Sequence, residues 1–277
     1  MWAIDRPKRT AEEVARTCAD GMQDEALQSA VLAAIDEFLA NSAAYQSNAA
    51  SDLLHQAVPS HYPVTGISDD EMRWIYSRRL AGARSPGRAI YDEIMRAAPH
   101  KLCAYCQCRP ATTLDHFVPK ATLATLSVEP WNLIPCCFDC NHRLGTSWSP
   151  DPASQMLHPY FMPELGRWLR AEVEHTSPVT ITYFAEPEVG LDSGLVNRVC
   201  LQFNKLSLGS VYSIVSSPEL TTLGRVLNSQ FSEASDIKAY LLEIATETLA
   251  VNENDRRGAM YEALGRDDWY CINALAV

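Results

Sequence analysis

The chain has 277 residues, of which 47% are hydrophobic, and its 23 Lys and Arg against 34 Asp and Glu give a formal net charge of −11. A chain of this length can bury a substantial core in one or two domains. It has no apolar run of about 18 residues and no apolar segment of the signal-peptide kind near its start, which argues against a membrane span and against secretion. We therefore expect a cytoplasmic protein.

The charge is distributed unevenly along the chain. Between Arg73 and Arg170 there are 12 Lys and Arg against 7 Asp and Glu, a net of +5, so the remaining residues carry −16. Lys and Arg neutralise phosphates when a protein binds nucleic acid, so the basic segment is compatible with such a partner. The same arginines also fit solvated helix faces, and composition does not decide between the two interpretations.

The N-terminal part of the chain is predicted to be helical. Apolar residues at three-to-four spacing extend from Thr10, a possible N-cap, to about Ala44. Asn41–Thr65 is richer in Ser, Asn and Pro and is interpreted as a connector, with a short helix only at Ser51–Ala57.

A second helical block follows this connector. Ser68 and Glu71 have the spacing of a capping box, so we expect a helix to start there, and a further helix is predicted at Pro86–Ala97. The apolar faces expected to be buried are Met72, Ile75, Tyr76 and Leu80 in the first helix, and Ile90, Tyr91 and Ile94 in the second.

The C-terminal half begins with strand character and returns to helix. Trp168–Glu174 and Val179–Phe184 alternate apolar with polar residues, which predicts a β-hairpin. Helices are predicted at Ser217–Leu227, Glu233–Ala250 and Asp255–Leu264. Acidic positions mark an exposed face of this region: Glu233, Asp236, Glu243 and Glu247.

Six of the nine cysteines lie in one central stretch, residues 101–148. Two C-x-x-C pairs are separated by 30 residues, and they predict a closed, structural zinc site formed by Cys103, Cys106, Cys137 and Cys140. Cys108 and Cys136 offer alternative partners, but the symmetric choice leaves them as spare thiols. The competing interpretation, a redox-active C-x-x-C pair, expects one pair beside a βαβ pattern.

Residues suited to hydrolysis lie within and beside this zinc site. Asp115 and His116 fall between the two cysteine pairs, Asn132 follows them, and Asn141 comes directly after the last cysteine. A lone His or Asp is most often structural. In this arrangement, however, an imidazole can take a proton from water at cellular pH, and carboxylate and amide oxygens suit Mg²⁺ or Mn²⁺.

The order C-x-x-C, Asp-His, Asn and C-x-x-C-Asn resembles the HNH endonuclease family, whose core is the ββα-metal unit. The resemblance covers about 50 residues. It implies that Asp115 and His116 sit on the first strand of a hairpin and that Asn141 begins the short helix. It also implies that His116 is the general base, that Asp115 and Asn141 hold a divalent cation, and that Asn132 orients the histidine through its loop.

One part of the family pattern differs in this chain. Family members often have Lys a few residues after the final Cys-Asn, whereas this chain has His142 and Arg143, so Arg143 is expected to carry the phosphate contact. Arg109 and Lys120 are the other residues expected to bind nucleic acid. His142 is an alternative metal ligand, although neighbouring helix residues point in different directions.

A wider resemblance concerns residues 88–225. The strings LDHFVPK, NLIPCCFDCN and LHPYF are similar to HNH nucleases of bacterial anti-phage defence, including the nuclease subunit of Septu-type systems. Such proteins often work beside an ATPase partner, and the acidic flanks suit a protein interface better than DNA. The resemblance makes His158 a candidate to support the site, although a turn residue before Pro159 is the simpler interpretation.

The sequence thus predicts an α+β protein, mainly helical, built around a zinc-stapled ββα-metal core with a β-hairpin after it. The expected division is an N-terminal helical region (1–98), the nuclease core (99–150) and a C-terminal hairpin and helical region (151–277). The expected function is metal-dependent hydrolysis of DNA phosphodiester bonds, with structural Zn²⁺ and catalytic Mg²⁺ or Mn²⁺. The alternative is a non-catalytic zinc-knuckle module that binds nucleic acid or a protein, for which Asp115, His116 and Asn141 would be unnecessary.

Overall fold

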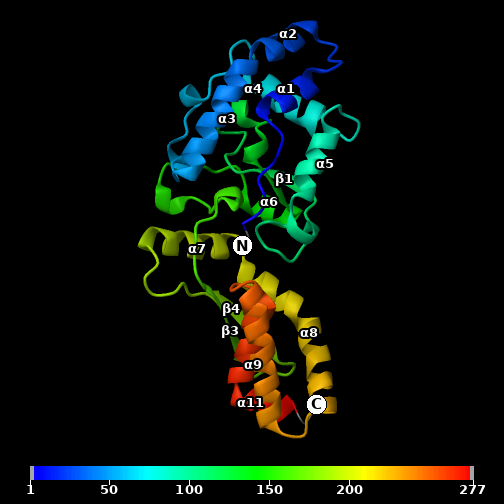
Figure 1. Ribbon diagram of the computed structural model, residues 1–277, viewed down its shortest axis with the longest axis vertical. Helices are drawn as coiled ribbons and strands as arrows, with labels where there is room; N and C mark the ends of the chain where they lie inside the picture. Colours follow the sequence, from blue (N-terminus) through cyan, green and yellow to red (C-terminus); the bar gives the residue numbers. More distant parts are fainter. Residues whose placement is uncertain (1–2, 275–277) are drawn as a thin grey trace. The chain divides into compact units, whose positions relative to one another are not determined.

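The computed structural model describes residues 3–274, which form two compact units that divide after Met162 (Figure 1). Each unit contains a two-stranded antiparallel sheet and several helices, in agreement with the expected α+β class. The first unit contains α1 (Ala11–Ala19), α2 (Glu25–Ala33), α3 (Ile35–Ala50), α4 (Asp69–Trp74), α5 (Arg88–Arg96), β1 (Thr113–His116), β2 (Leu133–Cys136) and α6 (Phe138–Leu144). The second contains β3 (Leu169–Glu174), β4 (Thr180–Ala185), α7 (Ser193–Lys205), α8 (Leu208–Gln230), α9 (Ala234–Val251), α10 (Arg256–Arg266) and α11 (Asp268–Asn273).

The N-terminal helices start at side-chain caps. The Thr10 hydroxyl accepts a hydrogen bond from the Glu13 N–H at 3.2 Å, and the Glu13 carboxylate accepts one from the Thr10 N–H at 2.9 Å, which confirms Thr10 as the N-cap of α1. The predicted helical region is divided, because Gly21 has a φ of +62° and Asp24 starts a new helix as the N-cap of α2.

The connector predicted at Asn41–Thr65 is wrong over its first part, because α3 continues through it. Asn41 and Ser42 are buried in this helix despite their polarity. The Asn41 amide donates to the Pro63 carbonyl at 2.9 Å, and the Ser42 hydroxyl donates to the Glu129 carboxylate at 3.1 Å. Residues far away in the sequence thus complete the hydrogen bonds of these polar side chains, although the composition of the segment indicates a loop.

The segment between α3 and α4 contains short 3-10 turns. The helix expected at Ser51–Ala57 is reduced to the turn Leu54–Gln56. α4 then starts at the predicted capping box, because the Ser68 hydroxyl accepts from the Glu71 N–H at 3.3 Å while the Glu71 carboxylate accepts from the Ser68 N–H at 2.7 Å. The chain continues directly from α4 into a π-helix, η3 (Ile75–Leu80).

One hydrophobic core joins the helices of the first unit to the hairpin of β1 and β2. Leu114 of β1 is 2% exposed and Leu133 of β2 is 0% exposed, and both belong to the buried cluster that α1–α5 contribute to. The predicted apolar faces are buried in this cluster: Met72, Ile75, Tyr76, Leu80, Ile90, Tyr91 and Ile94. The helices therefore hold the hairpin that carries Asp115 and His116.

The second unit is built on the predicted hairpin, now β3 and β4. Its helix α8 packs closely against β4. A Cβ atom added at Gly209 of α8 would lie 2.8 Å from the Tyr183 carbonyl oxygen of β4, so only a glycine allows this approach. The predicted acidic face of α9 is exposed, because Glu233, Asp236, Glu243 and Glu247 all face solvent.

Helix α8 is longer than its prediction. It starts at Leu208 rather than Ser217 and contains Pro218 in its interior. The sequence predicts no helix at the positions of α7 and α11. Within residues 3–274, no helix is long and apolar enough to cross a membrane.

Candidate functional site

The candidate site is built on a strand–strand–helix segment in the first unit. β1 pairs with β2 antiparallel, so that Asp115 lies opposite Ile134 and His116 opposite Leu133. α6 follows β2 after one residue and packs against β1 (Figure 1). The resemblance to HNH nucleases implies a hairpin followed by a short helix that begins at Asn141, whereas α6 begins three residues earlier, at Phe138.

Four of the six central cysteines converge beside this segment. The sulfur atoms of Cys103, Cys106, Cys137 and Cys140 all lie within 4.8 Å of one another, and the four residues are buried. The Cys106 and Cys137 sulfurs are 3.9 Å apart. Tetrahedral zinc with Zn–S bonds of about 2.3 Å places its sulfurs about 3.8 Å apart, so the cluster fits this ion. The four predicted cysteines can therefore hold a metal ion such as zinc.

Backbone hydrogen bonds shape both cysteine pairs. The Cys103 N–H donates to the Arg109 carbonyl at 2.8 Å, and Gln107, with a φ of +59°, donates from its N–H to the Cys103 carbonyl at 2.9 Å. Cys137 is the N-cap of α6, and its sulfur accepts from the Cys140 N–H at 3.4 Å. Hydrogen bonds among the four sulfurs lower the pKa of Cys137 and raise the pKa values of Cys103 and Cys140, so the metal-free cluster shares its protons unequally.

The two remaining central cysteines lie outside this group. Cys136 ends β2 opposite Thr113 and is fully buried, and burial raises the pKa of its thiol. Cys108 is half-buried. Both positions agree with the interpretation of these residues as thiols outside the metal site.

The first cysteine pair also orients Asp115. Asp115 is 6% exposed, and its Oδ2 atom accepts a hydrogen bond from the Tyr105 hydroxyl at 2.9 Å. Tyr105 lies between Cys103 and Cys106 in the chain. A buried carboxylate needs such a partner, because burial without one is unfavourable. The cysteine cluster therefore fixes the side chain that holds this carboxylate.

Asn141 reaches the same strand from α6. Its amide nitrogen donates to the Thr113 hydroxyl at 3.4 Å. Thr113 and Asp115 are two residues apart on β1, so their side chains lie on one face of the strand. The Asn141 amide thus lies on the Asp115 face of β1, and its oxygen is not used in the contact with Thr113. A carboxylate and an amide oxygen are donors that Mg²⁺ and Mn²⁺ accept.

His116 is half-buried and fixed in one tautomer. Its Nε2 atom lies 2.9 Å from the Ser127 carbonyl oxygen, and because a carbonyl only accepts, Nε2 carries the proton and Nδ1 is free to accept one. The Tyr76 ring, presented by the π-helix, packs edge-on against the imidazole with ring centres 4.4 Å apart. Burial lowers the pKa of His116 to about 4, and the nearby Lys120 lowers it further, so the ring is neutral at neutral pH.

Asn132 holds the loop that carries the Ser127 carbonyl. Its amide nitrogen donates to the carbonyls of Val118 at 3.0 Å and Leu126 at 3.2 Å. Its side-chain oxygen accepts from the Val118 N–H at 2.7 Å and from the Tyr45 hydroxyl at 3.1 Å. Asn132 is fully buried, and these bonds use both amide protons and both oxygen lone pairs.

The residues expected to bind nucleic acid lie in different surroundings. Arg109 is ion-paired with Asp139 of α6 at 2.6 Å. The Lys120 ammonium lies 4.8 Å from the centre of the Tyr76 ring, and burial together with Arg73 lowers its pKa. Arg143 on α6 is exposed.

The alternative ligand His142 is also exposed on α6. Its ring is stacked on Phe138, which is 70% exposed, with the ring centres 6.0 Å apart. His142 and Asn141, as neighbours on this helix, point in different directions.

Several residues that contact the candidate site are not recognisable from the sequence. Tyr105, Ser127 and Tyr76 contact Asp115 or His116, but each is of a type that occurs throughout the chain. Tyr45 lies 87 residues from Asn132. The position of Tyr105 inside a predicted cysteine pair is the one feature that could have marked it.

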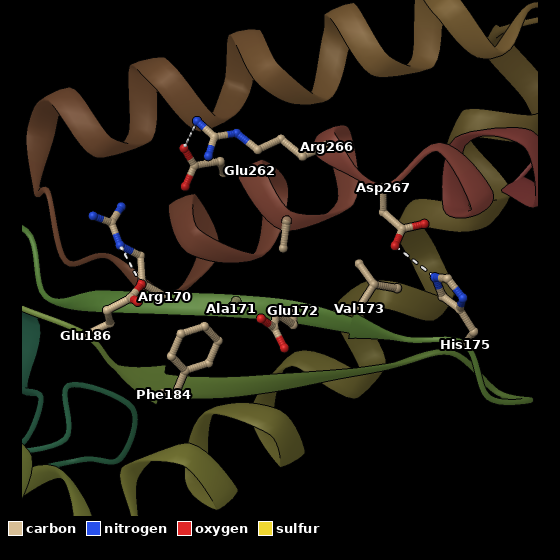
Figure 2. A pocket seen from close by; sticks show the side chains of 11 residues that line it. Arg170, Ala171, Glu172, Val173, His175, Phe184, Glu186, Glu262, Arg266 and Asp267 are labelled. Carbon is tan, nitrogen blue, oxygen red and sulfur yellow. Dashed lines mark hydrogen bonds and ion pairs between the residues drawn. The ribbon is translucent and has the colours of Figure 1, made fainter.

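A pocket of about 610 Å³ lies in the second unit, beside β3 and α10 (Figure 2). Four of its polar side chains form two pairs: Arg266 with Glu262 at 2.7 Å, and His175 with Asp267 at 2.8 Å. Of the described residues, those that line this pocket include no predicted catalytic or metal-binding residue.

Comparisons with known proteins place the chain near a phage protein. Over 240 aligned residues it is 24% identical to Protein ea31 of Escherichia phage lambda. The alignment covers 83% of this chain and 81% of that protein. No family model matches the sequence, and no solved structure matches it.

Proposed function

We propose that this protein is a metal-dependent endonuclease of the HNH type that hydrolyses phosphodiester bonds of DNA. The observation that carries the proposal is the state of His116, whose Nε2 is tied to the Ser127 carbonyl while Nδ1 is left as a proton acceptor. Asp115 precedes it on β1, and Asn141 reaches the Asp115 face of that strand from α6. A module that only binds has no need for a histidine held in this way.

In the proposed reaction, His116 takes the proton of the attacking water at Nδ1. A neutral imidazole is needed for this step, and burial, which lowers the pKa of His116, favours that form. The water oxygen attacks phosphorus and the bond to the 3′-oxygen breaks. Asp115 and Asn141 would hold Mg²⁺ or Mn²⁺, whose positive charge would neutralise the phosphate and the departing oxygen.

Zinc held by the four cysteines has a structural role in this proposal. Through Tyr105, the first cysteine pair positions Asp115. Through Cys137 and Cys140, the second pair fixes the first turn of α6, which carries Asn141. The two metals thus have separate tasks, because the thiolate site is closed and leaves no position for substrate.

We also propose that the nuclease works with a protein partner, an ATPase of the same anti-phage defence system. The exposed acidic face of α9 supports a protein partner rather than DNA at this surface. The resemblance of residues 88–225 to defence nucleases supports the class of partner.

Plasmid cleavage tests the proposed activity. With Mg²⁺ or Mn²⁺ the wild type is expected to nick or cut plasmid DNA, and His116→Ala is expected to abolish this while zinc content and folding are retained. His61→Ala, which removes an exposed histidine of the same unit, is the matched control and is expected to cleave normally. If the wild type cleaves no nucleic acid, with or without the products of neighbouring genes, the zinc-knuckle binding module takes the place of the nuclease.

A further inference from the structure

A buried chain of hydrogen bonds leads from the end of the first unit to the loop that holds His116. It involves His158, Tyr45 of α3 and Asn132, which are 5%, 0% and 0% exposed. Tyr45 and His158 are 113 residues apart in the sequence. Buried polar groups of this kind are retained where their hydrogen bonds are complete, so the direction of each bond can be worked out.

The tautomer of His158 determines which group donates in each of these hydrogen bonds. Its Nδ1 accepts from the Tyr160 N–H at 3.2 Å, so in the neutral ring the proton is on Nε2. Nε2 lies 2.9 Å from the Tyr45 oxygen and donates to it. The single Tyr45 proton is then free to point to the Asn132 side-chain oxygen, 3.1 Å away.

Asn132 links these hydrogen bonds to the loop that contains Leu126 and Ser127. Because its oxygen accepts from the Tyr45 hydroxyl and the Val118 N–H, the amide cannot flip without losing both bonds. In this orientation the nitrogen donates to the Leu126 carbonyl. The next residue, Ser127, presents the carbonyl that holds His116 Nε2 at 2.9 Å.

We propose that Tyr45 and His158 are positioning residues that fix the tautomer of His116 through Asn132 and Ser127. The inference rests on the proposed nuclease function for its consequence in catalysis, but the tautomer itself is measurable without activity. A loop free to shift would let the Ser127 carbonyl move away, and His116 would then place its proton on either nitrogen. Only the Nε2–H form leaves Nδ1 free to accept a proton.

Two measurements on the whole 277-residue chain, loaded with zinc, test this. Tyr45→Phe keeps the ring but removes the hydroxyl. It is expected to lower kcat for plasmid cleavage by about tenfold or more with KM little changed, because loss of a residue that orients a site residue typically has an effect of this size. In long-range ¹H–¹⁵N spectra of ¹⁵N-histidine-labelled protein, His116 is expected to change from the Nε2–H form to a mixture. Tyr62→Phe is the matched control, because Tyr62 is equally buried and its hydroxyl accepts from Asn48 outside this chain of bonds.

Equal kcat and equal His116 spectra in Tyr45→Phe and Tyr62→Phe overturn the proposal. If Tyr45→Phe does not fold, the pair His158→Gln and His158→Leu decides. Gln retains an N–H donor toward Tyr45 and is expected to rescue the wild-type spectrum and kcat, whereas Leu is expected to lose both. Identical behaviour of the two variants contradicts the inference. If the wild type cleaves no DNA, the nuclease function fails, while the spectra still decide the positioning of His116.

Discussion

The Tyr105 hydroxyl donates a hydrogen bond to Asp115 Oδ2 at 2.9 Å, and Tyr105 lies between two cysteines of the four-cysteine cluster. The four-cysteine cluster and the proposed catalytic carboxylate are therefore joined by one side chain. The backbone of the first cysteine pair places Tyr105, and Tyr105 in turn limits the directions that the carboxylate can take.

Tyr105→Phe is expected to weaken the response to the catalytic cation without loss of zinc. The substitution keeps the buried ring but leaves Asp115 Oδ2 without its donor, and loss of such an outer partner typically costs about 10–100-fold in metal affinity or activity. Cleavage measured against Mg²⁺ concentration should show a higher half-saturating concentration. Tyr160→Phe, which removes a buried hydroxyl that donates to the Leu133 carbonyl, is the control. An unchanged Mg²⁺ curve in Tyr105→Phe would show that this bond does not orient a metal ligand.

Cys140→Ser is expected to abolish zinc binding and to unfold the region around β1, β2 and α6. Thiolate binding of zinc is coupled to folding, because the closed site does not exist in the unfolded chain. Elemental analysis for zinc and thermal unfolding by circular dichroism measure the two effects. Cys136→Ala removes an equally buried thiol outside the cluster and should retain full zinc content. A soluble Cys140→Ser variant with the same zinc content as the wild type would contradict the assignment of the four cysteines as zinc ligands.

The folding stability is expected to depend on the titration of Glu129. This side chain is 4% exposed and accepts from Ser42 and the Trp131 N–H, yet burial raises its pKa from 4.5 to about 7. The folded state then binds more protons than the unfolded state between these values, so the free energy of unfolding falls as pH rises from 4.5 to 7. The full effect is about 3 kcal/mol above pH 7, at 1.36 kcal/mol per unit.

Glu129→Gln isolates this contribution, because its side-chain oxygen can accept the same two bonds without a charge. His158 acts in the opposite direction: burial lowers its pKa to about 3, so stability is lost as pH falls below 6.5. The difference in the free energy of unfolding between Glu129→Gln and the wild type does not contain the contribution of His158, which is the same in both. This difference should grow in favour of Glu129→Gln from pH 4.5 to 7. Urea unfolding at several pH values measures it, and a difference that is flat with pH would mean that Glu129 titrates normally.

Whether a feature can be predicted from the sequence depends on how far apart along the chain its determining residues lie. The Ser68 capping box and the two cysteine pairs depend on residues two or three positions apart, and their geometry is the expected one. Composition places Asn41 and Ser42 in a connector because it reflects their polarity but not their hydrogen-bond partners. Their partners lie 22 and 87 residues away, at Pro63 and Glu129.

The same reasoning applies to the candidate site. Asp115, His116 and Asn141 are marked by their places beside cysteine pairs, whereas the hydroxyl of Tyr45 is linked to Asn132 only by the fold. A single sequence contains no local pattern from which that bond could be inferred. The residues proposed to carry out the chemistry are therefore marked in the sequence, whereas the residues that contact and orient them are not.

Lys120→Met is expected to weaken DNA binding and to reduce its dependence on salt. The Lys120 ammonium lies 4.8 Å from the Tyr76 ring, which itself contacts His116, so a phosphate bound at the site lies within reach of this charge. Loss of one phosphate contact should lower the slope of log Kd against log salt by about one, uniformly across DNA sequences. Fluorescence anisotropy with His116→Ala as the background, which prevents cleavage, measures the slope. Arg16→Met, at an exposed arginine of α1 paired with Glu12, is the control, and an equal change in both variants would assign the effect to overall charge rather than to the site.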